Sequence, residues 1–549
     1  MSRRRAERAG LPLTLLLAWL VCYPLLLTLA EALGAPNLTL SHFREFASRP
    51  DEWQALWNSL WISAATVGIS AAIGIPLGFL FQRVEFPGRR LLSAFVALPV
   101  VLPPLVGVVA FLFLYGESGF LARAVQAVTG SEEPPWRLSG PGAILLVHGY
   151  SMYVYFYLFT RAGLARLDAA YLEAAASLGS RGLRTTTRIA LPLLSPALTG
   201  AALLTFMTSL ASFSAPYIFG GNFRVMTTRI VASRLNGDLA LSMVESLALA
   251  VVALAGLAVM QRTGASRDVA GAVRGLAPAR RSMGRPGIIV TVLASFMAVF
   301  LLLPHATLLL ISFVPRGTWT SEALPPVLTL SNYAALASQP ERLRPVVNSL
   351  WMASAATAVA LVLGFAAAWV SIARRSRWRG WLETLIAIPW ALPGTVFAVA
   401  MAATFSRNAP WFGRFLLVGT AAILPLAYLV RSLPLTGRAA FAGMRQLDPA
   451  LGEAASSLGA SPARRLWRVT VPLLRPSLAA GAALAFITAL GDFVVSILLY
   501  TYDTRPISIE ILSSLRLQET GVAAAYGVLL AALSAAVFFL WGGSEESRA

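Results

Sequence analysis

Long apolar stretches alternate with short polar segments along almost the whole chain. A membrane-spanning helix needs about 20 mostly apolar residues, and the first such run, Leu11 to Ala30, contains no charged side chain. Comparable runs predict twelve spans, near residues 11–30, 57–81, 91–115, 141–161, 196–217, 239–260, 287–313, 347–372, 381–404, 415–432, 476–500 and 520–541. The pattern therefore predicts an all-α membrane protein.

A cleaved signal peptide is the competing interpretation of the first run. Three arginines precede it, and Ala30-Glu31-Ala32 resembles a signal-peptidase site. The run is long for the apolar part of a signal peptide, and an equivalent run recurs in the second half of the chain. We therefore expect it to be a permanent span.

The composition supports a membrane location and excludes several kinds of enzyme. Hydrophobic residues make up 57% of the chain and charged residues 13%, whereas a soluble domain has about 25% charged residues. The single cysteine, Cys22, excludes an internal disulfide, and His42, His148 and His305 share no metal-ligand spacing. The chain contains no lysine, so it cannot form the lysine-containing phosphate loop of many ATPases. We expect no cofactor and no metal bound by this chain.

The distribution of arginine predicts the orientation in the membrane. The formal net charge is +19, and cytoplasmic loops keep an excess of positive charge. Arginines gather in alternate connections, 82–90, 162–195, 261–286, 373–380 and 433–475. Both termini are therefore expected in the cytoplasm. Because the arginines lie in short loops between apolar spans and form no single basic face, nucleic-acid binding is not expected.

The two halves of the chain resemble each other. Leu38-Thr39-Leu40-Ser41 and Asn58-Ser59-Leu60-Trp61 recur, at one constant spacing, as Leu328-Thr329-Leu330-Ser331 and Asn348-Ser349-Leu350-Trp351. We expect one unit of six spans in residues 1–260, a cytoplasmic linker in 261–286, and a second unit in 287–549. An even number of spans makes the two units parallel repeats, with a substrate path expected at their interface.

The strongest motif is the predicted cytoplasmic loop between spans four and five of each unit, at about 166–195 and 446–475. Each loop reads Glu-Ala-Ala, then a Gly, then a Pro. Asp168 and Asp448 are suited to begin a short helix, and the glycines to end it in a left-handed cap. We expect a second short helix after each glycine, ended by Pro192 or Pro472. A stiff helical projection suits docking into a partner's groove, whereas an amphipathic loop on lipid headgroups would explain only the arginines.

This spacing resembles the EAA loop of ABC-importer permeases, and two six-span units with one loop each are similar to the fused ferric-iron, thiamine and phosphonate permeases. The resemblance implies a type I ABC-importer fold in the cell inner membrane, a binding-protein partner, and one ATPase copy per loop, with ATP used only by those partners. The residues implied to couple to the ATPases are Glu173, Ala174, Ala175, Gly179, Pro192, Glu453, Ala454, Ala455, Gly459 and Pro472. Ferric iron is the first choice of solute, because Tyr500 to Ser508 looks similar to iron permeases; thiamine, phosphonate and polyamine remain open.

Polar and helix-breaking residues inside the spans are candidates for the pathway. These candidates are Ser212, Ser214, Asp492, Ser496, Pro103 and Pro393. Asp492 could equally be a structural residue at a helix break, with its carboxylate hydrogen-bonded to the backbone or to an interfacial water. For Glu245 and His148 the simpler interpretation is burial between helices. For Glu383 it is a position at the membrane interface.

Two other functional classes compete with an ABC importer. A twelve-span secondary transporter would need ionisable residues at mid-membrane for ion coupling, and the sequence offers few. A membrane scaffold or assembly protein is the non-transport alternative. Neither alternative explains two matched EAA loops.

Overall fold

A computed structural model describes residues 3–34, 37–100, 102–180, 182–265, 281–282, 286–319, 324–373 and 377–542. These residues are mostly helical. Their one ladder is a parallel pair of two-residue strands, β1 (Val84–Glu85) with β2 (Arg281–Ser282). The all-α prediction is therefore confirmed.

The helices of the first half, in chain order, are α1 (Arg3–Ala32), α2 (Ser41–Ser48), α3 (Pro50–Arg83), α4 (Arg89–Ala97), η1 (Leu98–Val100), α5 (Pro104–Tyr115), α6 (Phe120–Thr129), α7 (Gly140–Arg166), α8 (Ala169–Ser177), α9 (Leu183–Thr185), η2 (Thr186–Ala190), α10 (Leu191–Leu193), α11 (Ser195–Leu210), α12 (Ser214–Phe219), α13 (Met226–Leu235) and α14 (Leu239–Ala265). Most of the expected linker, 266–280 and 283–285, lies outside the described residues.

The helices of the second half are α15 (Pro286–Ser312), α16 (Ser331–Ser338), α17 (Pro340–Ala368), η3 (Trp369–Ala373), α18 (Arg379–Ala391), α19 (Gly394–Thr404), η4 (Pro410–Phe412), α20 (Ile423–Gln446), α21 (Pro449–Ser457), α22 (Pro462–Arg465), η5 (Leu466–Thr470), α23 (Val471–Leu490), α24 (Val494–Leu499), α25 (Ile507–Arg516), α26 (Thr520–Val537) and η6 (Phe538–Gly542). The order of long, short and broken helices largely repeats that of the first half.

The described residues contain between nine and eleven candidate membrane spans. Nine helices are long and apolar enough to cross a membrane, and two further pairs qualify if each bent pair is one span. One of these pairs, α18 with α19, bends by 108° just before Gly394. The predicted span 415–432 is wrong in its bounds, because α20 begins at Ile423 and continues to Gln446. The predicted total of twelve is therefore not confirmed.

The repeated Asn-Ser-Leu-Trp motif has the same structural role in both halves. Ser59 on α3 accepts a hydrogen bond from the backbone N–H of Met226 at 2.8 Å. Ser349 on α17 accepts one from the backbone N–H of Ile507, also at 2.8 Å. Asn58 donates to the backbone carbonyl of Arg224, and Asn348 donates to that of Asp503. Both acceptors lie just before the same two helices, α13 and α25. The motif thus fixes the start of α13 or α25 against a long span, and buried backbone groups stay paired.

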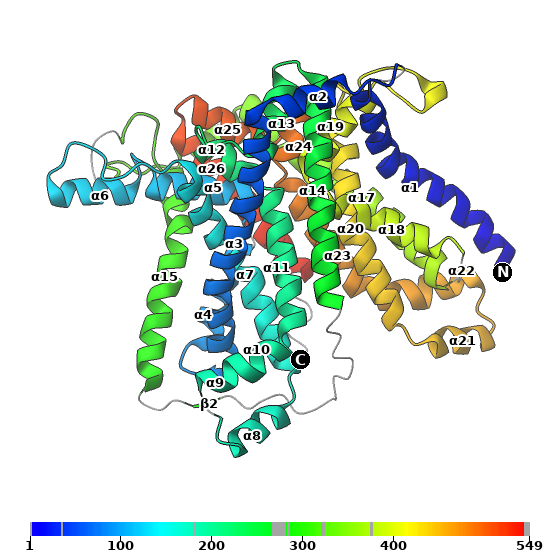
Figure 1. Cartoon of the computed structure of the whole chain (residues 1–549), viewed down its shortest axis with the longest axis horizontal. Helices are drawn as coiled ribbons and strands as arrows, with labels where there is room; N and C mark the ends of the chain where they lie inside the picture. Colours follow the sequence, from blue (N-terminus) through cyan, green and yellow to red (C-terminus); the bar gives the residue numbers. More distant parts are fainter. Residues whose placement is uncertain are drawn as a thin grey trace.

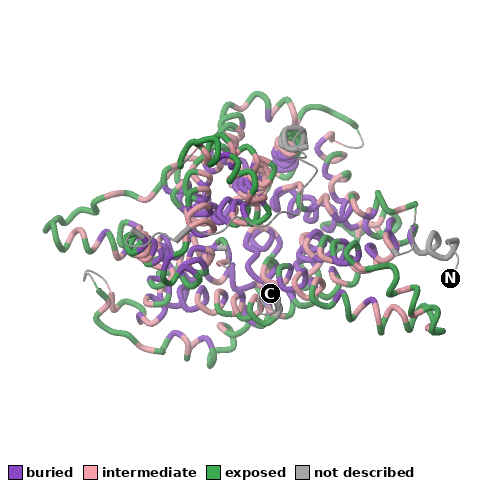
Figure 2. The backbone as a smooth tube through the Cα atoms, turned by 90° about the horizontal axis from the view of Figure 1, so that it is seen from below, coloured by how far each residue is buried: buried purple, intermediate pink, exposed green. Residues whose placement is uncertain are grey.

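Each half contributes its first long helix to the other half. α1 packs against α18 and α19, and α15 packs against α4, α5 and α26. Leu17 and Val21 of α1 are fully buried in a cluster that contains Phe397 and Met401 of α19. Ala298 of α15 is buried beside Leu92 of α4. The two halves are therefore interlocked by apolar burial, and the buried residues gather toward the middle of the molecule (Figure 2).

The loops that carry the motif lie at one end of the molecule. In Figure 1, α8 and α21 are at the lower end, whereas α2, α13 and α25 are at the upper end. The α3 and α7 helices run between these ends in the first half, and α17 and α20 do so in the second. Both units thus face the same way, as parallel repeats do.

Candidate functional site: two paired loops and a central cavity

The short helices α8 and α21 begin with the predicted aspartate caps. Asp168 accepts a hydrogen bond from the backbone N–H of Ala170 at 3.0 Å, and Asp448 accepts one from Ala450 at 2.9 Å. Such a cap satisfies one of the unpaired donors in the first helical turn. These two caps confirm the local prediction in both loops.

Both helices end at a glycine in the left-handed conformation, as predicted. The φ angles are +80° at Gly179 and +78° at Gly459. In the first loop the backbone N–H of Ser180 bonds to the carbonyl of Ala175 at 2.9 Å, and in the second Ala460 bonds to Ala455 at 3.0 Å. This pairing is the Schellman motif, which satisfies the last carbonyls of a helix.

The two helices present the same surface. Glu173, Ala174, Glu453 and Ala454 are exposed, whereas Ala175 is buried. Directly before each glycine lies an exposed leucine, Leu178 or Leu458, and each of these side chains is 88% exposed. Sequence reasoning missed these leucines, although both occupy the same place in the repeat. A single exposed apolar side chain is ordinary, but the same leucine at the same place in both loops gives the two helices a matching apolar surface.

The predicted end of the second helix at proline is wrong for Pro472, whereas in the first loop α10 ends at Leu193, one residue after Pro192. Pro192 and Pro472 are exposed and lie in the first turn of α10 and α23. A backbone N–H in the first turn has no acceptor within its helix, so proline, which lacks the N–H, is tolerated there. The π-helical segments η2 and η5 precede them, and the N–H groups of Leu191 and Val471 bond five residues back, to Thr186 and Leu466. The wider turn accommodates the proline ring, and in the second loop the helix continues past Pro472. From Pro462 it reaches Leu490 without a sharp bend, whereas the first-half helix bends by 72° near Leu194.

The two loops differ in their internal contacts. Nη1 of Arg465 in α22 donates to Oγ of Ser456 in α21 at 2.8 Å. In the first half, Thr185 and Ala176 occupy these positions, and Thr185 contacts Ser180 instead, at 3.1 Å between hydroxyl oxygens. A cavity of about 630 Å³ lies beside the second loop and includes Glu453 and Arg465 in its lining.

A central cavity of about 430 Å³ lies between the two halves. Its walls include the proline-rich breaks before α5 and α19, part of α7, and the turns that follow α11 and α23. Four of the six pathway candidates line it: Pro103, Ser212, Ser214 and Asp492. Ser496 and Pro393 are buried outside its lining, because Ser496 bonds to Tyr428 and Pro393 lies in the sharp bend that begins α19.

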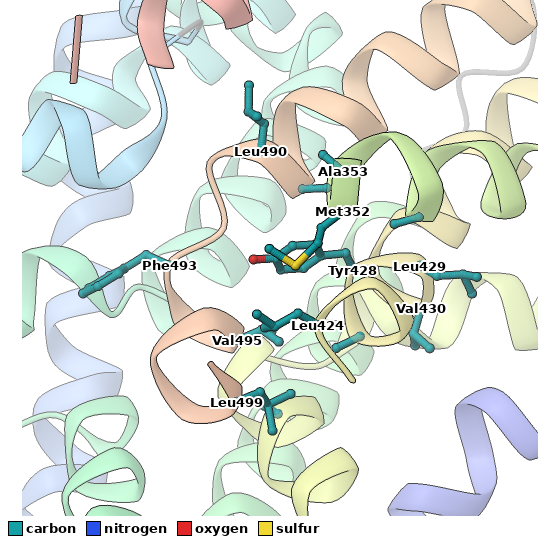
Figure 3. Packing of buried hydrophobic residues seen from close by; sticks show 14 of the residues in the cluster. Met352, Ala353, Leu424, Tyr428, Leu429, Val430, Leu490, Phe493, Val495 and Leu499 are labelled. Atoms are coloured by element: carbon teal, nitrogen blue, oxygen red, sulfur yellow. The ribbon is translucent and has the colours of Figure 1, made fainter. Parts of the chain in front are cut away.

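The broken helices of the two halves meet beside this cavity. The rings of Phe213, after α11, and Phe493, after α23, lie 5.4 Å apart between centroids. A side chain at Gly491 would come within 2.8 Å of Pro103, so the second break needs glycine at this close approach. Figure 3 shows Phe493 on the turn and Tyr428 reaching toward it from α20. The Tyr428 hydroxyl lies 2.6 Å from Oγ of Ser496.

Asp492 combines both roles considered for it. Its Oδ1 accepts a hydrogen bond from the backbone N–H of Val495 at 2.8 Å, which satisfies the start of α24. Its Oδ2 lies 3.4 Å from Nε of Arg431, a second charged residue in the cavity wall. Sequence reasoning missed Arg431, because the predicted span ended at 432 and placed this arginine at its edge.

The first half presents a histidine and hydroxyl groups at the corresponding place. His148 is buried, and its Nε2 lies 2.9 Å from Oγ of Ser212, the counterpart of Asp492. Its Nδ1 lies 3.2 Å from the hydroxyls of Thr66 and Ser209. The predicted burial of His148 is confirmed, and the charged pair is confined to the second half's wall.

The other ionisable candidates form structural pairs. Glu245 is fully buried and accepts from Ser233 at 2.7 Å. It belongs to a cluster in which Arg229 donates two hydrogen bonds to Glu52, at 2.7 and 2.9 Å. The carboxylate of Glu52 raises the pKa of Arg229 against the opposing effect of partial burial. Glu383 pairs with two arginines at the surface.

The comparisons with known proteins agree with this architecture. Residues 74–263 and 360–543 match the family described as binding-protein-dependent transport system inner membrane component. The probable ABC transporter permease protein y4fN of Sinorhizobium fredii is 30% identical over 540 residues, which cover 96% of this chain and 95% of that protein. The ferric transport system permease protein FbpB of Actinobacillus pleuropneumoniae is 28% identical, covering 88% of this chain and 70% of its own length.

A shorter relative matches one half. The molybdenum transport system permease protein ModB of Mycobacterium bovis is 28% identical over 230 residues, which cover 41% of this chain and 85% of that protein. The family match falls once in each half of the chain, as the internal repeat requires. The chain belongs to the binding-protein-dependent transport system inner membrane components, the permease subunits of ABC importers, which are transport subunits and not enzymes.

Proposed function

We propose that α8 and α21 are coupling helices, each seated in a groove of a separate ATPase subunit. The observation that carries this proposal is the matched pair itself. Both helices lie at one end of the molecule (Figure 1), both are fixed by an aspartate cap and a left-handed glycine, and both expose a leucine to 88%. Two equivalent rigid projections suit two copies of one partner.

The proposed organisation follows from this assignment. The coupling helices face the cytoplasm, where ATP is available, and so do both termini. Residues 1–260 and 287–549 form the two permease units, and 261–286 links them. An extracytoplasmic binding protein delivers solute to the opposite end of the bundle. Closure of the ATPases moves the coupling helices, and the central cavity opens alternately to the two sides.

Ferric iron is the proposed solute. The support is the similarity to a ferric permease over most of this chain and the fused, double-length layout. The similarity to a molybdenum permease covers only half of the chain. Phosphonate, thiamine and polyamine are the rival solutes.

Reversing the charge of both coupling helices tests the proposal. The chain is purified from its host membranes with an affinity tag, and ATP hydrolysis by the purified complex is measured. Glu173→Lys with Glu453→Lys should remove the co-purified ATPase and abolish ATP-dependent uptake of ⁵⁵Fe. Glu132→Lys with Glu133→Lys is the matched control for ATPase co-purification, because these glutamates are exposed in the connection between α6 and α7, away from α8 and α21. If uptake survives the first pair of changes, the coupling assignment is wrong.

A further inference from the structure

The central cavity contains a guanidinium whose donors are not all used by the protein. Nη1 of Arg431 is buried and has no hydrogen-bond partner among the described residues. Nε of Arg431 lies 3.4 Å from Asp492, longer than the roughly 2.7–2.9 Å of a strong charge-assisted hydrogen bond. A guanidinium has five N–H donors and remains charged. A buried unpaired donor is costly. Nη1 itself is covered by Gly394, so the acceptor of a ligand would meet the other donors of this side chain, which is 27% exposed and lines the cavity.

Asp492 does not meet this demand. One of its oxygens is held by the backbone of Val495 at the start of α24. The other faces only the Nε edge of Arg431. The Asp492 side chain is 5% exposed and that of Arg431 is 27% exposed, so the arginine is the more accessible partner. Among the described residues that line the cavity, these two are the only Asp, Glu, Lys or Arg side chains.

Gly394 makes room for the guanidinium. A Cβ atom at this glycine would lie 1.6 Å from Nη1 of Arg431. Gly394 is also the first residue of α19, and the partial positive charge of a helix start adds to that of the arginine. In the first half, Pro104 and Ser151 occupy the corresponding positions and also line the cavity. The positive site is therefore built on one side only.

We propose that Arg431 binds an oxyanion group of the transported solute within the central cavity. This inference rests on the proposed transport function and narrows its solute. The solute carries a carboxylate, phosphate or similar group, either free or as a ligand of a ferric ion. A cavity of about 430 Å³ is in the range that holds small molecules. A polyamine is disfavoured, because the guanidinium repels its ammonium groups and Asp492, already bonded to the N–H of Val495 and beside Arg431, has little left to offer them.

The test is equilibrium binding to the full-length chain in lipid nanodiscs without any ATPase. The probes are radiolabelled citrate, ferric citrate, inorganic phosphate and putrescine. Arg431→Gln should weaken binding of the oxyanion probes about 10- to 100-fold, because it removes a charged hydrogen bond, and Arg431→Lys should restore part of it. Arg445→Gln should bind as wild type, since Arg445 is exposed on the same helix and pairs with Glu383, outside the cavity lining.

A second variant separates binding from folding. Arg431→Gln combined with Asp492→Asn removes both charges, so no unpaired carboxylate is left in the cavity, and it should still lose oxyanion binding. Preference for ferric citrate over citrate would identify the chelate as the form bound, and equal binding would identify the free oxyanion. The proposal is overturned if putrescine binds instead, if Arg431→Gln binds like wild type, or if no oxyanion probe binds at millimolar concentration. Because no ATPase is present, failure of the coupling assignment would not produce any of these results.

Discussion

The left-handed glycines offer the most direct test of how the coupling helices are shaped. Gly179 and Gly459 have φ angles of +80° and +78°. A Cβ atom added at either position would meet no atom within 4 Å. Replacement by alanine therefore creates no clash, and its cost is that of the backbone alone. That cost is about 1–2 kcal/mol for a residue with a side chain in the left-handed region.

This cost predicts a measurable loss of partner binding. About 1–2 kcal/mol corresponds to a factor of roughly 5–30 in an equilibrium, so Gly179→Ala and Gly459→Ala should each weaken ATPase binding by about that factor. The assay is the dissociation constant between the chain in nanodiscs and the ATPase that co-purifies with wild type. The stability of the transmembrane bundle should not change, because both glycines lie outside it.

Gly452→Ala provides the matched control within α21. Gly452 is helical, and an added Cβ would meet only Arg465 Cδ, at an ordinary 3.7 Å. Alanine is favoured over glycine by about 1 kcal/mol inside a helix, so this variant should bind at least as tightly as wild type. The reasoning is refuted if the two cap variants bind like wild type, or if Gly452→Ala weakens binding as much as they do.

Three further predictions concern the bundle. Ser349→Ala leaves the buried N–H of Ile507 unpaired and should cost about 1–3 kcal/mol; thermal unfolding in detergent checks this, and an unchanged midpoint would contradict it. Glu52→Gln breaks the buried ion pair with Arg229 and should lower the free energy of unfolding by about 3–5 kcal/mol, measured again by thermal unfolding. A smaller loss of stability than that of Ser349→Ala would contradict the buried ion pair. Gly394→Ala should displace Arg431 and reduce oxyanion binding, whereas Gly380→Ala, with no atom near its added Cβ, should not; equal effects would refute the packing argument.

The features predicted from sequence are those set by local chemistry. Asp168 and Gly179 fix the two ends of α8 through contacts within a few residues, so their residue types and spacing were sufficient. Their counterparts in α21 repeat the same local solution. The helix end predicted at Pro472 is wrong because the π turn before it depends on the register of the whole helix, which a residue-by-residue pattern does not reveal.

The features missed depend on contacts between distant segments. Hydropathy placed Arg431 at the edge of a span, because a single charge lowers the local average, and only the packing of α20 shows it in the cavity wall. The exchange of α1 and α15 between the halves has no local signal. The Asn-Ser-Leu-Trp repeat was visible in the sequence, but its partners, such as Met226, lie far along the chain.

The central claim is that both coupling helices contact ATPase subunits. Cys22 is the only cysteine, so a Cys22→Ser chain carrying Ala174→Cys or Ala454→Cys has one thiol, placed on an exposed position of α8 or α21. Each variant is labelled with a thiol-reactive photo-crosslinker in inside-out membrane vesicles and irradiated. The account predicts a crosslink to an ATPase subunit from both positions. The account is contradicted if the thiols react only in right-side-out vesicles, or if neither position gives a crosslink to an ATPase subunit.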